Sequence, residues 1–184
     1  MIAVLIPVLN AERTLGECLG ALTRAAIDGL VREVIIIDGG SQDASLEVAD
    51  DAGADIVSGQ GDRGAQLAAG LARAKSPWIL TLRQDTRLLS GWEAVAARHL
   101  ETAPDAAGWF FLRQVAWPGR LAAGLIGPGE GIGLLTPRQI CVGAGGYAPG
   151  RAEGRLAQAI GRGRLKRLYA PVLNPVARDG QAAR

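Results

Sequence analysis

The segment from Glu33 to Asp43 constrains the fold of this chain more than any other. It reads Glu-Val-Ile-Ile-Ile-Asp-Gly-Gly-Ser-Gln-Asp, so a β-branched apolar run stops abruptly at a carboxylate and two glycines. Such a run is too short for a helix and predicts a strand buried on both faces, which is typical of parallel sheets. These sheets bind ligands at the loops that follow the carboxyl ends of their strands. The segment therefore predicts an α/β fold with a binding site near Asp38.

Strands and helices alternate regularly over roughly the first hundred residues. We expect strands at 2–6, 33–38, 55–57 and 78–82. Helices are expected to begin near four places: Asn10, Ser41 or Asp43, Arg63, and Ser90. The first helix should bury one face, which carries Leu15, Cys18, Leu19 and Leu22. This order predicts a three-layer α/β/α sandwich with a mostly parallel central sheet. Later segments predict a strand at 108–117, a Gly/Pro-rich section at 118–133, a strand and helix at 134–142, a helix at 153–160 and a basic strand at 164–169.

Composition limits the class of protein. With 184 residues, of which 48% are hydrophobic, the chain can bury the core of one domain, which we place at 1–174 with a tail at 175–184. A net charge of only +2 gives no electrostatic case for nucleic acid, and no apolar run approaches the roughly 20 residues that cross a bilayer. The chain begins with a strand rather than a signal segment, and Cys18 and Cys141 fit two buried thiols of a reducing compartment. We expect a cytoplasmic protein, with peripheral contact to a membrane left open.

Polar residues follow three of the expected parallel strands. The three motifs are Ile6-Pro7-Val8-Leu9-Asn10, Ile37-Asp38-Gly39-Gly40-Ser41-Gln42-Asp43 and Thr81-Leu82-Arg83-Gln84-Asp85-Thr86-Arg87. In this order and spacing they resemble the family 2 glycosyltransferases, especially short bacterial members whose second motif reads Asp-Gly-Gly-Ser. The resemblance is good over roughly the first hundred residues and loose beyond them. It implies a GT-A fold and transfer of a sugar from a nucleotide diphosphate to an acceptor hydroxyl.

The resemblance implies that residues 1–104 bind the nucleotide. Pro7 and Asn10 belong to the first motif, and Asp38 stands where the family contacts the nucleobase. Many relatives carry two consecutive acids there, whereas Gly39 follows Asp38 in this chain. The alternative for Asp38 is a structural role as a helix cap, which is the role we favour for Asp43.

Arg63 follows a glycine-bearing loop and begins an expected helix. An arginine at this place in relatives reaches the base or the phosphates, and a guanidinium beside helical N–H groups suits anion binding. A solvated arginine at a helix start is the alternative.

Asp85 ends the triplet Arg83-Gln84-Asp85. The family holds a divalent cation with a short acidic motif at this place, usually Asp-x-Asp, whose last acid binds the metal that bridges the diphosphate. Only that acid is present here, and Arg83 replaces a carboxylate or neutral residue. The resemblance implies that Asp85 binds Mg²⁺ or Mn²⁺, and one carboxylate can suffice because such ions often keep several waters. It also implies that Gln84 forms a hydrogen bond with a ribose hydroxyl. In the alternatives, Arg83 helps to neutralise the leaving diphosphate and lowers the need for metal, or Asp85 only forms a turn.

Glu153 is the candidate catalytic base. Relatives carry a Glu-Asp pair before a helix that ends in Leu-Gly-Arg; here Ala152-Glu153 precede a helix that ends in Ile160-Gly161-Arg162. A carboxylate at this position would take the proton of the acceptor hydroxyl as the anomeric carbon is attacked from behind, which inverts its configuration. Two alternatives stay open. Glu153 could serve only the helix dipole, and Glu130, which we also place at the substrate site, could be the base.

Three further features carry weaker expectations. The cations Arg162, Arg164, Lys166 and Arg167 would hold a diphosphate or a phospholipid-linked acceptor, or would protect an exposed edge strand from aggregation. His99 is expected at the surface. The aromatic residues Trp109, Phe110, Phe111 and Trp117 are expected in the sheet core or the acceptor wall rather than on nucleic acid.

We therefore expect a metal-dependent, inverting glycosyltransferase that uses a nucleotide-diphosphate sugar and an unidentified hydroxyl acceptor, lipid-linked acceptors included. Residues 105–174 would bind the acceptor. The rival is a non-catalytic nucleotide-sugar-binding or scaffold protein, favoured by the missing acids at Arg83 and Ala152. A nucleotidyltransferase is disfavoured because no glycine-rich loop with a lysine follows the first strand.

Overall fold

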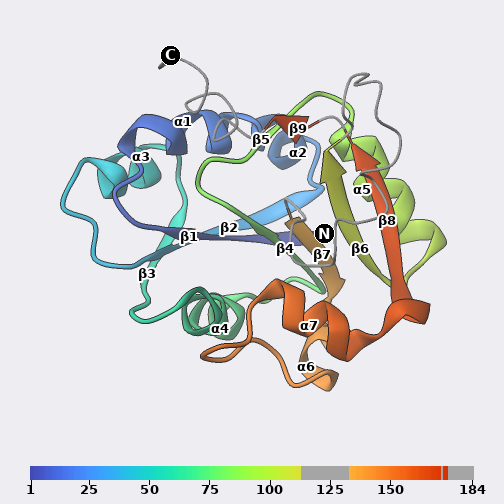
Figure 1. Cartoon of the computed structure of the whole chain (residues 1–184). Coiled ribbons are helices and arrows are strands. Elements are labelled where there is room, and N and C mark those ends of the chain that lie inside the picture. The colour runs from blue at the N-terminus through green and yellow to red at the C-terminus, as the bar shows by residue number, and fades with distance from the viewer. Residues whose placement is uncertain (113–132, 171, 174–184) are drawn as a thin grey trace, which may run out of the picture.

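Seven strands form one sheet in the computed structural model, which describes residues 1–112, 133–170 and 172–173 (Figure 1). In spatial order the strands are β3 (Asp55–Ser58), β2 (Val31–Asp38), β1 (Ile2–Val8), β4 (Trp78–Leu82), β7 (Gly133–Pro137), β6 (Ala107–Leu112) and β8 (Leu165–Ala170). The four strands from β3 to β4 are parallel, and β7 runs antiparallel to both of its neighbours. A separate ladder joins β5 (Arg87–Leu88) to β9 (Val172–Leu173).

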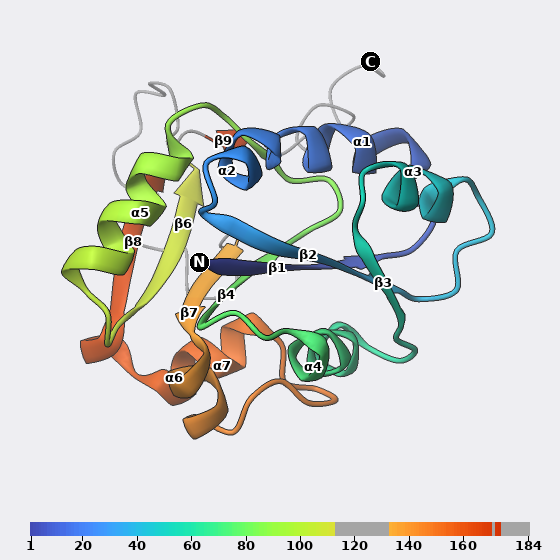
Figure 2. The same ribbon diagram turned by 180° about the vertical axis from the view of Figure 1, so that it is seen from behind.

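Helices cover both faces of the sheet, as the two opposite views in Figures 1 and 2 show. One layer holds α1 (Glu12–Gly20), α2 (Thr23–Ile27), α3 (Ser45–Asp51) and α5 (Trp92–Thr102). The other layer holds α4 (Arg63–Arg73), α6 (Arg138–Gly143) and α7 (Glu153–Ile160), and a turn of 3-10 helix, η2 (Arg162–Arg164), leads into β8. The predicted α/β/α sandwich with a mostly parallel sheet is confirmed.

The central strands are apolar throughout because both of their faces are buried. Alternate side chains of a strand point to opposite faces. In β1, Val4 and Ile6 pack in the core beneath the layer of α1, whereas Ala3 and Leu5 pack in the core beneath α4. Within the part of the chain that the structure describes, no helix combines the length and apolar character needed to span a membrane.

The first helix differs from the expectation at both ends. Its N-cap is Ala11, because Asn10 adopts a left-handed conformation with φ of 49° and its Oδ1 accepts the N–H of Gln42 at 2.8 Å. Asparagine tolerates this conformation better than most residues, and its side chain competes well for nearby backbone groups. At the other end, α1 stops at Gly20, and Leu22 is the buried N-cap of α2 rather than part of one continuous helix.

In two helices the observed N-cap residue lies one position after the predicted one. The N-cap of α3 is Ala44, but the carboxylate of Asp43 accepts the N–H of Ser45 at 3.0 Å and that of Glu12 at 3.1 Å. Asp43 thus serves the first turns of two helices. The N-cap of α5 is Gly91, whose N–H is accepted by Glu93 at 2.9 Å.

His99 is buried, so the expectation of a surface position is wrong. The residue is 5% exposed on α5, its Nε2 lies 2.9 Å from the carbonyl oxygen of Ala106, and its ring meets Trp78 edge-on with the centroids 5.7 Å apart. Burial lowers the pKa of His99 below its usual value. The partners of His99 are Trp78 in β4 and the carbonyl of Ala106, directly before β6, and the residue pattern of the helix alone cannot reveal them.

The expected burial of the aromatic strand is confirmed where it is described. Trp109 and Phe110 are buried on opposite faces of β6. Residues 113–132, which include Trp117 and Glu130, lie outside the described residues. At the far end of the sheet, β8 is an edge strand, as the alternative for the basic cluster predicted.

Candidate active site

The carboxyl ends of the parallel strands meet at one edge of the sheet. Val8 at the end of β1 is in register with Asp38 at the end of β2, and Leu82 at the end of β4 lies opposite Gly133, where β7 begins. Because these strands share a direction, the loops that follow them lie together. All three sequence motifs are therefore at the same edge.

A cavity of about 310 Å³ opens at this edge. It is lined by Pro7, Val8, Leu9, Gly61, Arg63, Gln66, Arg83, Gln84 and Asp85. Five residues predicted for the site are among them, namely Pro7, Arg63, Arg83, Gln84 and Asp85. Asn10 and Asp38 follow the same strands but are not lining residues of this cavity. Its volume is at the small end of the range of about 300 to 1,000 Å³ found for ligand sites.

Asp85 is held by Arg83 in a tight turn after β4. The Nε and Nη2 of Arg83 donate to the two carboxylate oxygens of Asp85 at 3.0 and 3.2 Å. The Asp85 side chain is 10% exposed, whereas that of Arg83 is 52% exposed. Hydrogen bonding to Asp85 raises the pKa of Arg83 above its already high value, so this guanidinium is charged at any physiological pH.

Backbone bonds fix the shape of this turn. The N–H of Thr86 donates to the carbonyl oxygen of Arg83 at 3.0 Å, and the hydroxyl of Thr86 accepts the N–H of Arg83 at 3.3 Å. From α1, the Sγ of Cys18 lies 3.6 Å from the same carbonyl. Burial raises the pKa of Cys18 to about 12, with the charge of Asp85 adding to the effect. Cys18 is therefore a neutral thiol that supports the turn.

Gln84 ties this turn to the loop after β1. Its Oε1 accepts the N–H of Leu9 at 2.8 Å, and its Nε2 donates to the carbonyl oxygen of Leu9 at 3.3 Å. Both polar groups of the side chain are thus engaged with backbone, and the predicted bond to a ribose hydroxyl stays a prediction.

Asp38 organises the loop after β2. Its two oxygens accept the N–H groups of Gly40 and Ser41 at 3.1 and 3.0 Å. Gly39, where many relatives carry a second acid, lies close to Gln66, and a Cβ there would be 2.7 Å from the Nε2 of Gln66 at the cavity. A carboxylate at position 39 would need Gln66 to move. The predicted contact of Asp38 with a base stays a prediction.

Arg63 joins the two halves of the chain. It begins α4 after Asp62, whose side chain caps the helix, and its Nε lies 3.0 Å from both carboxylate oxygens of Glu153. Its Nη2 donates to Glu153 at 2.5 Å and to the carbonyl oxygen of Leu82 at 3.1 Å. The Glu153 side chain is 14% exposed and that of Arg63 is 33% exposed. The predicted base therefore contacts a cation that lines the cavity.

The loop before α7 docks closely on the start of α4. A Cβ on Gly64 would overlap the carbonyl oxygen of Ala148, and the N–H of Gly150 donates to Asp62 at 2.5 Å. Ala148 and Arg151 form an isolated β-bridge that closes this loop. Sequence reasoning missed Asp62 and Gly64 as positioning residues. The signal was an N-cap followed by a glycine in the first turn of a helix, which indicates a close backbone approach.

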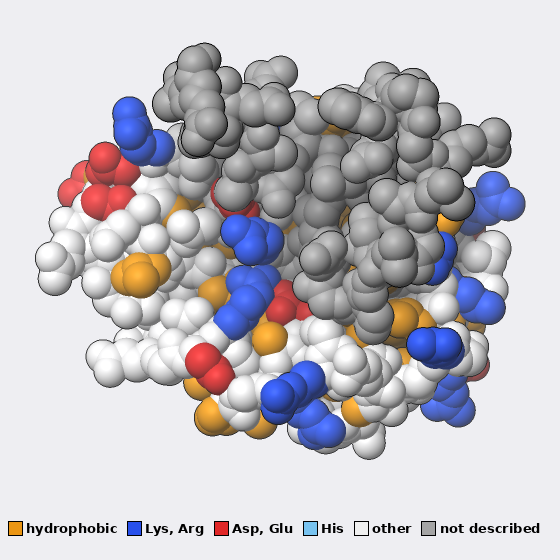
Figure 3. Space-filling view, viewed as in Figure 1, with side chains coloured by type: hydrophobic (Ala, Val, Ile, Leu, Met, Phe, Trp, Pro, Cys, Tyr) orange, Lys and Arg blue, Asp and Glu red, His pale blue; other side chains and the backbone are white. Residues whose placement is uncertain are grey.

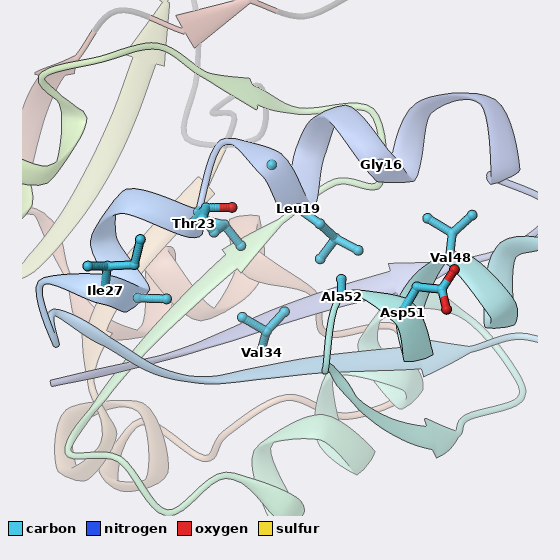
Figure 4. A pocket seen from close by; sticks show the side chains of 11 residues that line it. Gly16, Leu19, Thr23, Ile27, Val34, Val48, Asp51 and Ala52 are labelled. Atoms are coloured by element: carbon cyan, nitrogen blue, oxygen red, sulfur yellow. The ribbon is translucent and has the colours of Figure 1, made fainter.

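Another cavity lacks the chemistry of a phosphate site. It measures about 450 Å³ and lies between α1, α2, α3 and β2 (Figure 4). Its walls are mainly apolar, with Leu19, Ile27, Val34 and Val48 among them, and Asp51 is its charged lining residue. On the face of the molecule drawn in Figure 3, the described Lys and Arg side chains lie in separate groups.

The described carboxylates do not form a ready cation site. No three His, Cys, Asp or Glu side chains come together in residues 1–112, 133–170 and 172–173 as metal ligands would. Asp85, which lines the cavity, accepts hydrogen bonds from Arg83 at both oxygens, and Glu153 accepts them at both oxygens from Arg63, another lining residue. A divalent cation at Asp85 would have to compete with the guanidinium for the same oxygens.

Solved structures of glycosyltransferases share this fold. Glucosyl-3-phosphoglycerate synthase from Mycobacterium tuberculosis, in complex with Mn²⁺, uridine diphosphate (UDP) and glucosyl-3-phosphoglycerate, matches with a TM-score of 0.75 and 21% identity over 95% of this chain and 71% of that one. The same enzyme has also been solved with Mg²⁺ and UDP, with a TM-score of 0.73 and 21% identity over 95% of this chain and 71% of that one. TarS from S. aureus matches with a TM-score of 0.72 and 15% identity over 92% of this chain and 36% of that one.

Comparison with curated proteins finds no match to the sequence. A family model, by contrast, matches most of the chain: the model described as glycosyl transferase family 2 matches residues 3–154, which include the three motifs, Arg63 and Glu153. The chain belongs to glycosyl transferase family 2.

Proposed function

We propose that this chain transfers a sugar from a nucleotide-diphosphate sugar to an acceptor hydroxyl with inversion at the anomeric carbon. The observation that carries the proposal is the cavity at the ends of β1 and β4, where Arg63 and Arg83 lie beside Asp85 and Arg63 contacts Glu153. Two guanidinium groups suit a diphosphate, because each can donate two parallel hydrogen bonds to phosphate oxygens.

The donor would lie along the edge formed by the first half of the chain, residues 1–104. Asp38 would contact the base, Pro7 and the loop that includes Asn10 would border the nucleoside, and Arg63 and Arg83 would hold the diphosphate. The presence of UDP in structures of the same fold supports a nucleotide as the ligand of this chain. Within this scheme Gln84 keeps the loops after β1 and β4 together, through its bonds to Leu9.

Glu153 would act as the base. Its carboxylate takes the proton of the acceptor hydroxyl while the hydroxyl oxygen forms a bond to the anomeric carbon. The bond from that carbon to the diphosphate oxygen breaks, and its electron pair stays on the diphosphate, where the two arginines stabilise the new charge. Glu130 lies outside the described residues and remains the alternative base.

A divalent metal is found with the glucosyl-3-phosphoglycerate synthase, in complexes with Mn²⁺ or Mg²⁺. The prediction of such an ion at Asp85 fits poorly with the bonds that Arg83 makes to both of its oxygens. No step of the reaction described above passes through a metal.

The acceptor would be bound by residues 105–174. The exposed cations Arg162 and Arg164, which follow Glu153 on the chain, are candidates for the phosphate of a phosphorylated or lipid-linked acceptor. A cytoplasmic location is supported by the two buried, unpaired thiols, because oxidising compartments favour disulfides.

A non-catalytic nucleotide-sugar-binding protein is the second candidate. The observation in its favour is that two acids of the family pattern are replaced here by Arg83 and Ala152. Such a protein would bind nucleotide and leave sugar nucleotides intact.

The test begins with a thermal-shift screen of UDP, GDP, CDP, ADP and dTDP and of their common sugar conjugates. The conjugate that stabilises the protein is then assayed for hydrolysis or transfer, with Glu153→Gln beside the parent protein. We expect stabilisation by one base series and turnover that the substitution removes while nucleotide binding persists. Binding without any turnover would support the non-catalytic candidate, and no stabilisation by any nucleotide would overturn the proposal.

A further inference from the structure

We propose that Arg83, oriented by Asp85, takes the place of a divalent cation, so that this chain binds the donor diphosphate without metal. This inference rests on the proposed function, because it concerns how the same cavity holds the diphosphate. The family resemblance implies a metal ion at this place, whereas the inference depends on the arginine and carboxylate side chains that this chain has at the cavity.

The first argument is the state of the carboxylate. Asp85 is nearly buried, and both of its oxygens accept hydrogen bonds from Arg83 at 3.0 and 3.2 Å. Mg²⁺ demands near-octahedral oxygen geometry and is usually bound through one or two carboxylates together with substrate phosphates, so Asp85 would have to exchange its bonds to Arg83 for bonds to the metal. Asp85 is the carboxylate among the residues that line the cavity, and Glu153, which contacts the lining residue Arg63, also accepts hydrogen bonds at both of its oxygens.

The second argument is charge. A pair of carboxylates with a divalent cation is neutral overall, and so is one carboxylate with one guanidinium. Where the family pattern implied by the resemblance has a carboxylate at this position, an arginine raises the local charge by two units, which is the charge that the metal would supply. The pair of Arg83 and Asp85 therefore has the same net charge as two carboxylates with a bound divalent cation.

The third argument is geometry. Arg83 lines the cavity and is half exposed, so its guanidinium is accessible to a ligand while its Nε edge is fixed by Asp85. Among the described residues, Nη1 of Arg83 makes no hydrogen bond, and it remains free to donate to a phosphate oxygen. One backbone bond and one bond to the Thr86 hydroxyl hold the turn of Arg83 in place, so binding a ligand would cost little further loss of conformational freedom.

Arg63, the first residue of α4, supplies a second cation to the lining of the cavity. Its Nη2 also donates to the carbonyl of Leu82, the residue directly before Arg83. Both guanidinium groups thus belong to residues that line the same cavity at the end of β4. A diphosphate bound between them would be neutralised from both sides, as a bridging cation would do it.

The experiment measures binding of the nucleoside diphosphate that gives the largest thermal shift among UDP, GDP, CDP, ADP and dTDP. Calorimetric titrations are made with excess EDTA and then with Mn²⁺ or Mg²⁺, for the parent protein, Arg83→Ala and Arg83→Asp. Arg24→Ala is the matched control, because Arg24 is an exposed arginine paired with Asp28 on α2, away from the cavity. Circular dichroism and thermal unfolding check that each variant is folded.

For the parent protein we expect the same affinity in EDTA and in metal. Arg83→Ala should weaken binding in EDTA on the order of 10- to 100-fold, which is typical of a lost charged hydrogen bond. Arg83→Asp should bind only when Mn²⁺ is present, since it restores a second acid beside Asp85. Arg24→Ala should match the parent.

Two outcomes would overturn the inference. One is parent binding that EDTA abolishes and Mn²⁺ restores, which would leave the proposed transferase function intact. The other is unchanged affinity of Arg83→Ala in EDTA. If no nucleotide binds under any condition, the proposed function itself fails, and this result differs from both of the others.

Discussion

The two ion pairs of the cavity are built in different ways. Arg83 and Asp85 belong to one turn, and their side chains contact each other across two positions of the chain. Arg63 and Glu153 are joined across α4 and α7, and their contact depends on the docking of the loop before α7 on Gly64. The first pair therefore forms locally, and the second exists only when the two halves of the chain are packed together.

This difference has a functional consequence. The local pair presents a charged group with fixed geometry, which suits the binding of a diphosphate. The long-range pair joins the proposed base to the cavity-lining Arg63, so in the proposed mechanism the chemistry would depend on the docking of the second half. Substitutions at the junction of α4 and α7 should impair catalysis most, and substitutions in the turn should impair binding most.

The largest effect is expected for Glu153→Gln. The amide keeps the shape of the side chain but takes up no proton, so turnover should fall by about 10²- to 10⁴-fold with little change in nucleotide affinity. Steady-state rates and calorimetry on the same preparation measure both quantities. Glu47→Gln, at an exposed carboxylate on α3, is the control and should retain full activity. Full turnover by Glu153→Gln would assign the base to another residue.

Gly64→Ala should break the junction by packing alone. The added methyl group would overlap the carbonyl of Ala148, and the resulting backbone shift should lower the free energy of unfolding by about 1 to 3 kcal/mol and also reduce turnover. Urea denaturation and rate measurements test this. Gly20→Ala is the matched control, because a Cβ there meets nothing within 4 Å. Equal stability of the two variants would show that the loop before α7 can move away from Gly64 without loss of stability.

Thr86→Val should loosen the turn while leaving the junction intact. The substitution keeps the shape of a buried side chain but removes the hydroxyl that accepts the N–H of Arg83, at a cost of about 1 kcal/mol. We expect weaker nucleotide binding and a smaller loss in the turnover number at saturating donor. A loss of turnover larger than the loss of affinity would contradict the division of roles between the two pairs.

The smallest effect concerns the thiol beneath the turn. Burial raises the pKa of Cys18 to about 12, so the neutral thiol is favoured in the folded protein. Its contribution to stability is complete below the usual thiol pKa near 9 and is lost as the pH rises from there towards 12. At pH 8 the folded protein should leave Cys18 unmodified by iodoacetamide, as followed by mass spectrometry after digestion. Rapid modification without unfolding would mean that the turn opens in the native state.

Much of the fold follows from short-range patterns in the chain. The apolar runs of β1, β2 and β4 are buried on both faces, and their polar ends meet at one edge because parallel strands share a direction. Predictions failed where a side chain had a choice of partners. Asn10 bonds Gln42 instead of capping α1, and His99 turns into the core beside Trp78.

The sequence by itself determined the alternation of strands and helices in the first half and the resemblance to the family, because each depends on residues that are neighbours along the chain or repeat with the period of a strand. Only the tertiary structure decided that Arg63 contacts Glu153 and that Gln84 bonds the backbone of Leu9. These contacts join segments that lie far apart in sequence, and the bonds form where helix docking and sheet order bring donors and acceptors within reach. No local pattern encodes that proximity, since it results from burying apolar faces on both sides of the same sheet.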